Sequence, residues 1–295
     1  MALNDEKLTK DRSFFVAKDN RLITKSRYSL TLQQQKILLY LISRIKPNDE
    51  QGEIYELSIK DFAKVCGYVE DSGYYYQTIK ADIKKLRDVS SWIEIEPNRE
   101  VLFSWIDRAE IDKKSGTLRI SFHSTVSPYL FELREKYTQY SLYNVLCLSH
   151  KYSVRLYEYL CSMKFKEEFE ISLNELRKHI DAEKYTKFSH FKDRVFDPAV
   201  SDINNYTDLN IEYTFGKTGK KITHIKFKFI EQDAKKYAYS HMMRDSKIDP
   251  LRRQQERNYK KKVSEKYQEP IEVDGTVTAQ LTIDEFLDAI KGGDL

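Results

Sequence analysis

Apolar residues recur at helical spacing in three segments of the first half of the chain. Thr31-Leu32-Gln33-Gln34 has the form of a capping box, in which Thr31 is the N-cap and Gln34 is the third helical residue. A second helix start lies at Ser58, and a third apolar helix face follows it. The inward residues of that third helix are Ile79, Ile83 and Leu86. Alternating segments then predict strands at 92–96, 101–111 and 117–122.

The second half repeats this order. Residues 151–164 form an apolar helix pattern, and Ser172 with Glu175 marks another capping box. A third helix pattern begins near His190 and continues through Pro198, where we expect either the first turn of a continuing helix or a kink. Two alternating strands follow, at 209–215 and 222–229.

Three helices followed by a β-hairpin is the order of a winged helix-turn-helix domain. The chain contains two copies of this order, with similar spacing between the elements of each copy. It therefore predicts an α+β fold with two tandem winged helix-turn-helix domains and a C-terminal helical or disordered extension. We expect the first domain over 14–130 and the second over 131–232. The extension, 233–295, contains a basic helix and then a flexible acidic tail.

Charge is unevenly distributed along the 295 residues. From Lys235 to Lys262 ten Lys and Arg residues face three Asp and Glu, a net charge of +7, whereas from Val263 to Leu295 two face eight, a net charge of −6. Such separated blocks are typical of a protein with a polyanionic partner and a distinct tail, although a solvated helix before a disordered end has the same pattern.

Composition and motifs exclude several classes of protein. The polar opening stretch MALNDEKLTKDRS differs from a secretory signal, and the apolar run 37–42 is far too short to span a bilayer, so we expect a cytoplasmic protein without a membrane partner. The three cysteines lack metal-ligand spacing and are expected to be reduced core thiols. We therefore expect no cofactor.

Two longer blocks, KYTQYSLYNVLCLSHKYSVRLYEYL (136–160) and FKDRVFDPAVSDINNYTDLNIEY (191–213), resemble the iteron-binding plasmid replication initiators of the tandem winged-helix type. The segment 20–45 is similar to the first domain of that family, and the resemblance covers about residues 14–230. It implies a protein that binds direct repeats at a plasmid origin as a monomer, helps to melt an adjacent AT-rich segment and recruits host replication proteins. It also implies a dimer, joined through the first domain and in equilibrium with the monomer, that represses its own promoter.

The candidate DNA-contacting residues lie on the third helix of each copy and on the hairpin of the second copy. An Arg or Lys side chain can pair with guanine O6 and N7 in the major groove, and the planar fork of Arg194 suits that pairing. The alternative is a charge that solvates the helix or pairs with Asp193 or Asp197. The second-domain candidates are Lys187, His190, Lys192 and Arg194 on the helix and Lys217, Lys220, Lys221 and Lys226 on the hairpin. The first-domain candidates are Lys80, Lys84, Lys85 and Arg87.

The C-terminal stretch QLTIDEFLDAIKGGDL predicts a short amphipathic helix that could bind a host replication protein. It loosely resembles the peptide by which proteins dock on the bacterial sliding clamp. A host helicase or a host initiator is an alternative partner, and packing against the chain's own domains is another. The candidate partner-binding residues are Gln280, Leu281, Ile283, Phe286 and Leu287.

Two other functions compete with replication initiation. A winged-helix transcriptional regulator would bind an operator and start no replication. A nicking initiator would cleave DNA with a tyrosine and a metal held by a His-x-His pair, but no two of the six histidines are two residues apart. We therefore expect a protein that is not an enzyme.

Overall fold

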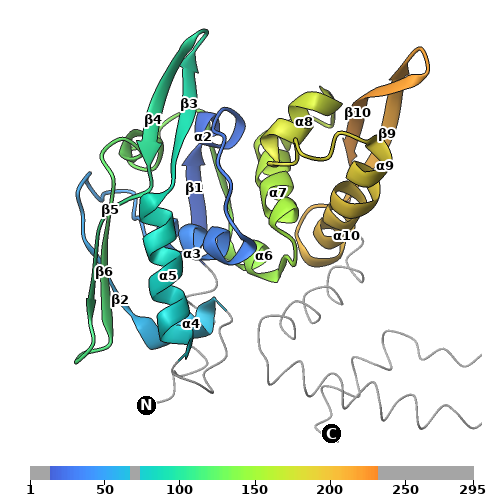
Figure 1. The fold of residues 1–295 in the computed structure, drawn as a ribbon. Helices are drawn as coiled ribbons and strands as arrows, with labels where there is room; N and C mark the ends of the chain where they lie inside the picture. The colour runs from blue at the N-terminus through green and yellow to red at the C-terminus, as the bar shows by residue number, and fades with distance from the viewer. Residues whose placement is uncertain (1–13, 67–73, 232–295) are drawn as a thin grey trace, which may run out of the picture. The chain divides into compact units, whose positions relative to one another are not determined.

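The structure, a computed structural model, describes residues 14–66 and 74–231 (Figure 1). The basic segment and the acidic tail, with Gln280, Leu281, Ile283, Phe286 and Leu287, lie outside the described residues. The elements of the first half are β1 (Phe15–Asp19), α2 (Asn20–Thr24), α3 (Leu32–Ile42), β2 (Tyr55–Ser58), α4 (Ile59–Val65), α5 (Tyr74–Asp88), β3 (Ser90–Glu96), β4 (Arg99–Ser104), β5 (Ile106–Asp112), β6 (Thr117–Phe122) and η1 (Ser127–Tyr129).

The second half follows a parallel plan. Its elements are β7 (Tyr137–Ser141), α6 (Leu142–Cys147), α7 (Lys151–Met163), β8 (Glu168–Ser172), α8 (Leu173–His179), α9 (Phe188–Phe191), the π-helical turn η2 (Lys192–Phe196), α10 (Asp197–Tyr206), β9 (Ile211–Thr218) and β10 (Lys221–Phe229).

The helix starts expected from the sequence are confirmed. Thr31 and Gln34 form the complete capping box of α3, and the hydroxyl groups of Ser58 and Ser172 accept hydrogen bonds from the third helical residues of α4 and α8. These bonds satisfy backbone N–H groups that have no partner within their own helix.

Sheet topology confirms the repeat. The antiparallel order β2-β6-β5 in the first half matches β8-β10-β9 in the second. In each case the short strand before the second helix pairs with the last strand of the hairpin. The short strands β2 and β8 were not expected from the sequence, but they complete two winged-helix sheets.

The expected strand over 101–111 is wrong as a single element. It breaks at Trp105, so that β4 pairs with β3 while β5 joins β6 in another sheet. The Trp105 side chain is fully buried and packs edge to face against Tyr28 and Phe103, each at 5.0 Å between ring centroids. Turning this large ring into the core bends the chain, and the first domain has two hairpins instead of one.

Strand β1 pairs antiparallel with β7, from Phe15 opposite Ser141 to Asp19 opposite Tyr137. The two halves are therefore joined by a strand pair. Helix α7 packs against elements of both halves, among them α2, α3, β7, α8 and α10. The expected boundary between residues 130 and 131 stays a prediction.

A charged cluster lies buried where α7 meets β1 and β7. The carboxylate of Glu158 contacts the ammonium of Lys18, accepts a hydrogen bond from the Tyr140 hydroxyl and lies 3.7 Å from the guanidinium of Arg155. Lys18 and Glu158 are 0% and 1% exposed. Burial and the nearby carboxylate raise the pKa of Tyr140 well above its usual value.

Two expectations concerned the cysteines and the membrane. Cys66, Cys147 and Cys161 are free thiols at buried or half-buried positions. None of the helices in the described ranges combines the length and the apolar character needed to cross a bilayer.

We predict that Glu158→Gln lowers the free energy of unfolding by about 3–5 kcal/mol, because Lys18 and Arg155 would remain buried without a carboxylate. The measurement is urea denaturation followed by circular dichroism. Glu175→Gln is the control, since Glu175 pairs with Lys178 at the surface and should cost under about 1 kcal/mol. Equal effects of the two substitutions would contradict the importance of the cluster.

Candidate nucleic-acid interface

The third helix of the second domain separates apolar and basic residues as the sequence predicts. The side chains of Phe191, Val195, Ala199 and Ile203 are buried against the core, each 1% exposed or less. On the outer side His190 and Arg194 are exposed, and Lys187 is the exposed N-cap residue of α9. The helix thus presents basic side chains to solvent from a fixed apolar base.

These basic side chains differ in their contacts. Among the described residues Lys187, His190 and Arg194 make no hydrogen bond or ion pair through their side chains, so all three are open to an external ligand. Lys192 instead forms an ion pair with Asp197 that raises the pKa of the ammonium. The alternative in which Arg194 pairs with Asp197 is therefore not what the structure shows.

The β9–β10 hairpin places three lysines at its tip. Lys217, Lys220 and Lys221 are all exposed around Gly219, whose φ of +61° closes the turn. Gly216 lies opposite His224, and a Cβ on Gly216 would come within 1.9 Å of the imidazole Nε2. A side chain at Gly216 would therefore displace the imidazole ring of His224.

Lys226 lies further along β10, and its ammonium is 2.6 Å from Glu168 on β8. His224 similarly lies 3.6 Å from Glu170. The expected basic face of this strand is thus opposed by acidic side chains of its neighbour, and unopposed positive charge is concentrated at the tip.

In the first domain α5 buries Ile79, Ile83 and Leu86 and leaves its basic side chains exposed. These exposed residues are Lys80, Lys84, Lys85 and Arg87. The side chain of Arg87 donates to the carbonyl oxygen of Asp107 at 3.2 Å, which ties the helix end to β5.

The first domain also has wing lysines, which were not predicted from the sequence. Lys113 and Lys114 are exposed at the turn between β5 and β6, the position equivalent to the tip of β9–β10. The signal was available in the Lys-Lys-Ser-Gly turn. Because 101–111 was expected to be one strand, the sequence did not show that β5 and β6 alone form the wing.

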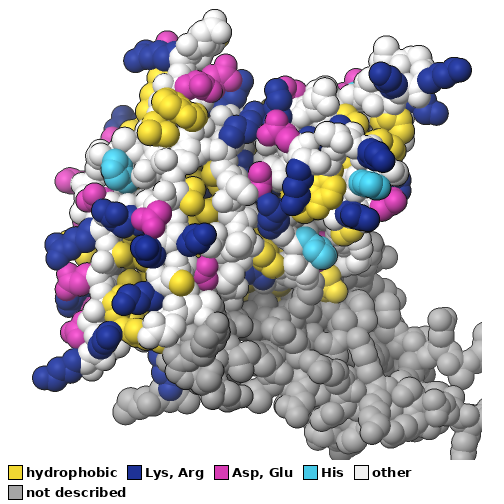
Figure 2. Space-filling model, viewed as in Figure 1, with side chains coloured by type: hydrophobic (Ala, Val, Ile, Leu, Met, Phe, Trp, Pro, Cys, Tyr) yellow, Lys and Arg dark blue, Asp and Glu magenta, His cyan; other side chains and the backbone are white. Residues whose placement is uncertain are grey.

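Figure 2 shows Lys and Arg side chains over α5 and over the region of α9 and the β9–β10 tip. Acidic side chains are interspersed between them. The positive groups therefore lie on two helix-turn-helix units and their hairpins.

Polar contacts connect the two units beside α7. The Arg27 guanidinium lies 3.4 Å from Nδ1 of His179 at the end of α8, and Arg155 donates to the carbonyl oxygen of His179 at 3.1 Å. Asp181 accepts hydrogen bonds from Ser29 and Lys151, both at 2.7 Å. Arg27 and Ser29 thus join the segment between α2 and α3 to the end of α8. Lys151 and Arg155 join α7 to the same place.

His179 is held neutral in this contact. Its ring stacks on Tyr159 with 4.7 Å between centroids. Burial, followed by the positive charges of Arg27 and Arg155, lowers the pKa of His179 to about 3.

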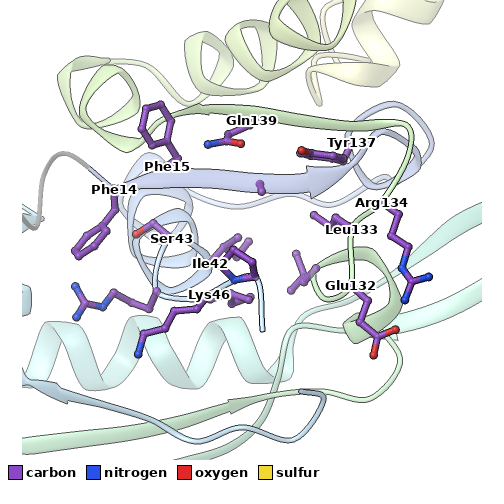
Figure 3. Close-up of a pocket in the computed structure, with 15 residues that line it drawn as sticks. Phe14, Phe15, Ile42, Ser43, Lys46, Glu132, Leu133, Arg134, Tyr137 and Gln139 are labelled. Carbon is purple, nitrogen blue, oxygen red and sulfur yellow. The ribbon is translucent and has the colours of Figure 1, made fainter. Parts of the chain in front are cut away.

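A pocket of about 550 Å³ lies apart from these basic helices (Figure 3). It is lined by residues of β1 and β7 with the end of α3, including Phe15, Ile42 and Tyr137. It contains no residue of α5, α9 or the β9–β10 hairpin, so it is separate from the candidate interface. Within the described ranges, no group of three His, Cys, Asp or Glu side chains is arranged to hold a metal ion.

Comparisons with known proteins agree with this architecture. Residues 15–161 match the family profile described as "Initiator Replication protein, WH1", and residues 172–229 match "Initiator Rep protein, WH2". A "Replication initiation protein" of Escherichia coli is 26% identical over 196 residues, which are 63% of this chain and 61% of that protein. An "Uncharacterized 27.6 kDa protein" of Escherichia coli is 22% identical over 223 residues, 69% of this chain and 90% of that protein.

Among solved structures, "Crystal structure of Pi initiator protein in complex with iteron DNA" is similar, with a TM-score of 0.60 and 22% sequence identity. The similarity covers 75% of this chain and 99% of that one. At this identity it supports the tandem winged-helix fold.

We predict that acid destabilises the protein through His179. Because the pKa of His179 is lower in the folded than in the unfolded chain, the unfolded state takes up the proton first as the pH falls below about 6.5. The free energy of unfolding should therefore drop by about 2 kcal/mol between about pH 7.5 and about pH 5. The measurement is urea denaturation at each pH. His179→Phe should reduce the pH dependence of the free energy of unfolding. The control His150→Gln, at an exposed site, should leave that dependence unchanged. The reverse pattern would contradict the role of His179.

Proposed function

Because the chain belongs to the family of initiator replication proteins with two winged-helix domains, we propose that it is a plasmid replication initiator that binds direct repeats, or iterons, in origin DNA. It acts in the cytoplasm as a DNA-binding protein and promotes melting of the neighbouring duplex. The observation that supports this best is the presence of exposed basic side chains on α5 and on the α9–η2–α10 helix, together with lysines at the tips of the β5–β6 and β9–β10 hairpins.

The two kinds of basic group have different tasks. Arg194 reads base edges in the major groove, because its guanidinium is exposed and makes no side-chain contact among the described residues. Lys187 and His190 lie beside it at the start of the same helix. The tip lysines Lys217, Lys220 and Lys221 contact phosphates, which fix position on the duplex without reading sequence. In the first domain, α5 enters a second segment of the same bipartite site. Its candidate residues carry less sequence information, because Lys contacts phosphate as a point charge; they are Lys80, Lys84, Lys85 and Arg87.

A second candidate function is that of a transcriptional regulator. Autorepression by a dimer would use the same helices on an operator. Replication initiation is favoured because the family match spans both domains and because a relative is described as a replication initiation protein.

The dimer uses the first domain. On the β3–β4 hairpin Trp92 and Leu102 lie directly opposite each other and are 52% and 46% exposed. Strand β4 has no second neighbour in the sheets of the described residues, so its outer edge can pair with the same strand of another copy. Large exposed apolar side chains beside an open strand edge are typical of such an interface.

Recruitment of a host protein is assigned to the tail. The residues proposed to bind a helicase, a host initiator or the sliding clamp are Gln280 and the apolar Leu281, Ile283, Phe286 and Leu287. Deletion of 276–295 should abolish origin firing in cells while DNA binding by the purified protein persists. Normal firing of the truncated protein would remove this part of the proposal.

We predict regularly spaced protection of direct repeats when the purified protein is footprinted on the DNA that flanks its gene. With about eight phosphate contacts, the slope of log affinity against log salt should be about −7. Arg194→Ala should cost about 1–3 kcal/mol at one base position and relax base preference there. Its matched control, Lys220→Ala, should weaken binding to all sequences and reduce the slope by about one.

Two outcomes would contradict the proposal. Protection of one inverted repeat alone would favour the regulator. Protection without sequence preference would mean that α9 does not read bases.

We predict that Trp92→Ser weakens self-association by about tenfold or more, because it removes the largest exposed apolar group of the hairpin. The measurement is sedimentation equilibrium over a range of protein concentrations. Phe165→Ser is the control, since Phe165 is 79% exposed and lies after α7, away from the β3–β4 strands. An equal effect of both substitutions, or none from Trp92→Ser, would place the dimer interface elsewhere.

A further inference from the structure

The recognition helix of the second domain changes its pitch among its DNA-facing residues. Pro198 has no backbone N–H, and in a regular α-helix its ring would collide with the carbonyl group of Arg194, four residues earlier. Instead the N–H of Asp197 donates to the carbonyl oxygen of Lys192, five residues back, and the chain forms the π-helical turn η2. The wider turn avoids the collision between the proline ring and the carbonyl group. Both Lys192 and Arg194 lie in this turn.

Asp197, at the end of this turn, has both carboxylate oxygens engaged. One oxygen, Oδ2, forms the ion pair with the Lys192 ammonium. The other, Oδ1, accepts a hydrogen bond of 2.9 Å from the Tyr213 hydroxyl on β9. A single carboxylate therefore joins the π-helical turn to the first strand of the wing.

Aromatic packing beneath this link holds the same two elements together. The Phe196 ring, fully buried, lies edge to face with Tyr213 at 4.8 Å and packs near Phe215 at 5.6 Å. Phe188, at the start of α9, meets Phe215 at 5.0 Å. Helix and wing are thus packed together under the polar link, to which Asp197 contributes its carboxylate.

We propose that Asp197 is a positioning residue that withholds Lys192 from DNA phosphates and fixes the π-helical turn against the wing. Lys192 is the one cation of the second-domain helix candidates with an intramolecular partner in the described residues. A free ammonium at this position would add a phosphate contact on every sequence and so favour non-specific binding. The inference rests on the proposed DNA-binding function, and it changes the expected role of Lys192 from DNA contact to helix–wing link.

The experiment measures the salt dependence of binding to a random-sequence duplex by fluorescence anisotropy. Asp197→Asn removes the charge but keeps an amide oxygen that can accept from Tyr213. It should steepen the slope by about 0.9, the value for one added phosphate contact. Lys192→Ala alone should leave the slope unchanged, and Lys192→Ala combined with Asp197→Asn should restore the original slope.

Two controls separate the charge from the packing. Tyr213→Phe keeps the ion pair and should leave the slope unchanged. Lys220→Ala should reduce the slope by about 0.9, which shows that the assay detects a single contact. The proposal is overturned if Lys192→Ala reduces the slope as Lys220→Ala does, if Asp197→Asn leaves it unchanged, or if Tyr213→Phe steepens it.

The assay also distinguishes this inference from the proposed function. Absence of salt-dependent binding by the unmodified protein would overturn both. Salt-dependent binding in which Lys192→Ala reduces the slope would overturn the role of Asp197 alone and leave the DNA-binding function intact.

Discussion

The buried carboxylate of Glu158 is the group on which the arrangement of the two halves most depends. It lies on α7 and contacts Lys18 of β1, Tyr140 of β7 and, at 3.7 Å, Arg155 of its own helix. Arg155 in turn donates to the Tyr28 hydroxyl and to the His179 carbonyl oxygen. Because a buried charge without its partner is costly, arrangements that separate these groups are disfavoured.

This constraint explains how one chain can hold the two proposed recognition helices in place. Helix α5 and the α9–α10 helix pack on separate winged-helix sheets, yet α7 contacts elements of both halves. A support that is already ordered lowers the entropy lost when both helices bind one DNA site. Within the second domain Asp197 performs a similar task on a smaller scale, since it links the recognition helix to its wing.

Local features of the fold could be predicted from the sequence. The capping box at Thr31, the start at Ser172 and the inward faces of the third helices depend on residues close together in the chain. The strand break at Trp105 could not be predicted, because it results from packing against Tyr28, far away in the sequence. Lys and Glu are residue types usually found at the surface, and only the fold shows that Lys18 and Glu158 meet in the interior.

The same distinction applies to the candidate site. Exposed basic residues such as Arg194 and Lys220 were identified from helix periodicity and turn chemistry. The ion pair of Lys192 with Asp197 was not, because it depends on the π-helical turn that precedes Pro198. The wing of the first domain, with Lys113 and Lys114, was not predicted, because the break at Trp105 that separates β5–β6 from β3–β4 depends on tertiary packing.

We propose that one chain reads one bipartite DNA site with two helices held in fixed relation. The most direct test is the affinity for a repeat in which about 5 base pairs, half a helical turn, are inserted between the segments contacted by the two domains. We expect the affinity to fall by at least about a hundredfold, toward the affinity for random DNA. The reason is that the insertion rotates the second segment to the opposite face of the duplex. Unchanged affinity for the inserted site would contradict it and would mean that one helix alone reads the sequence.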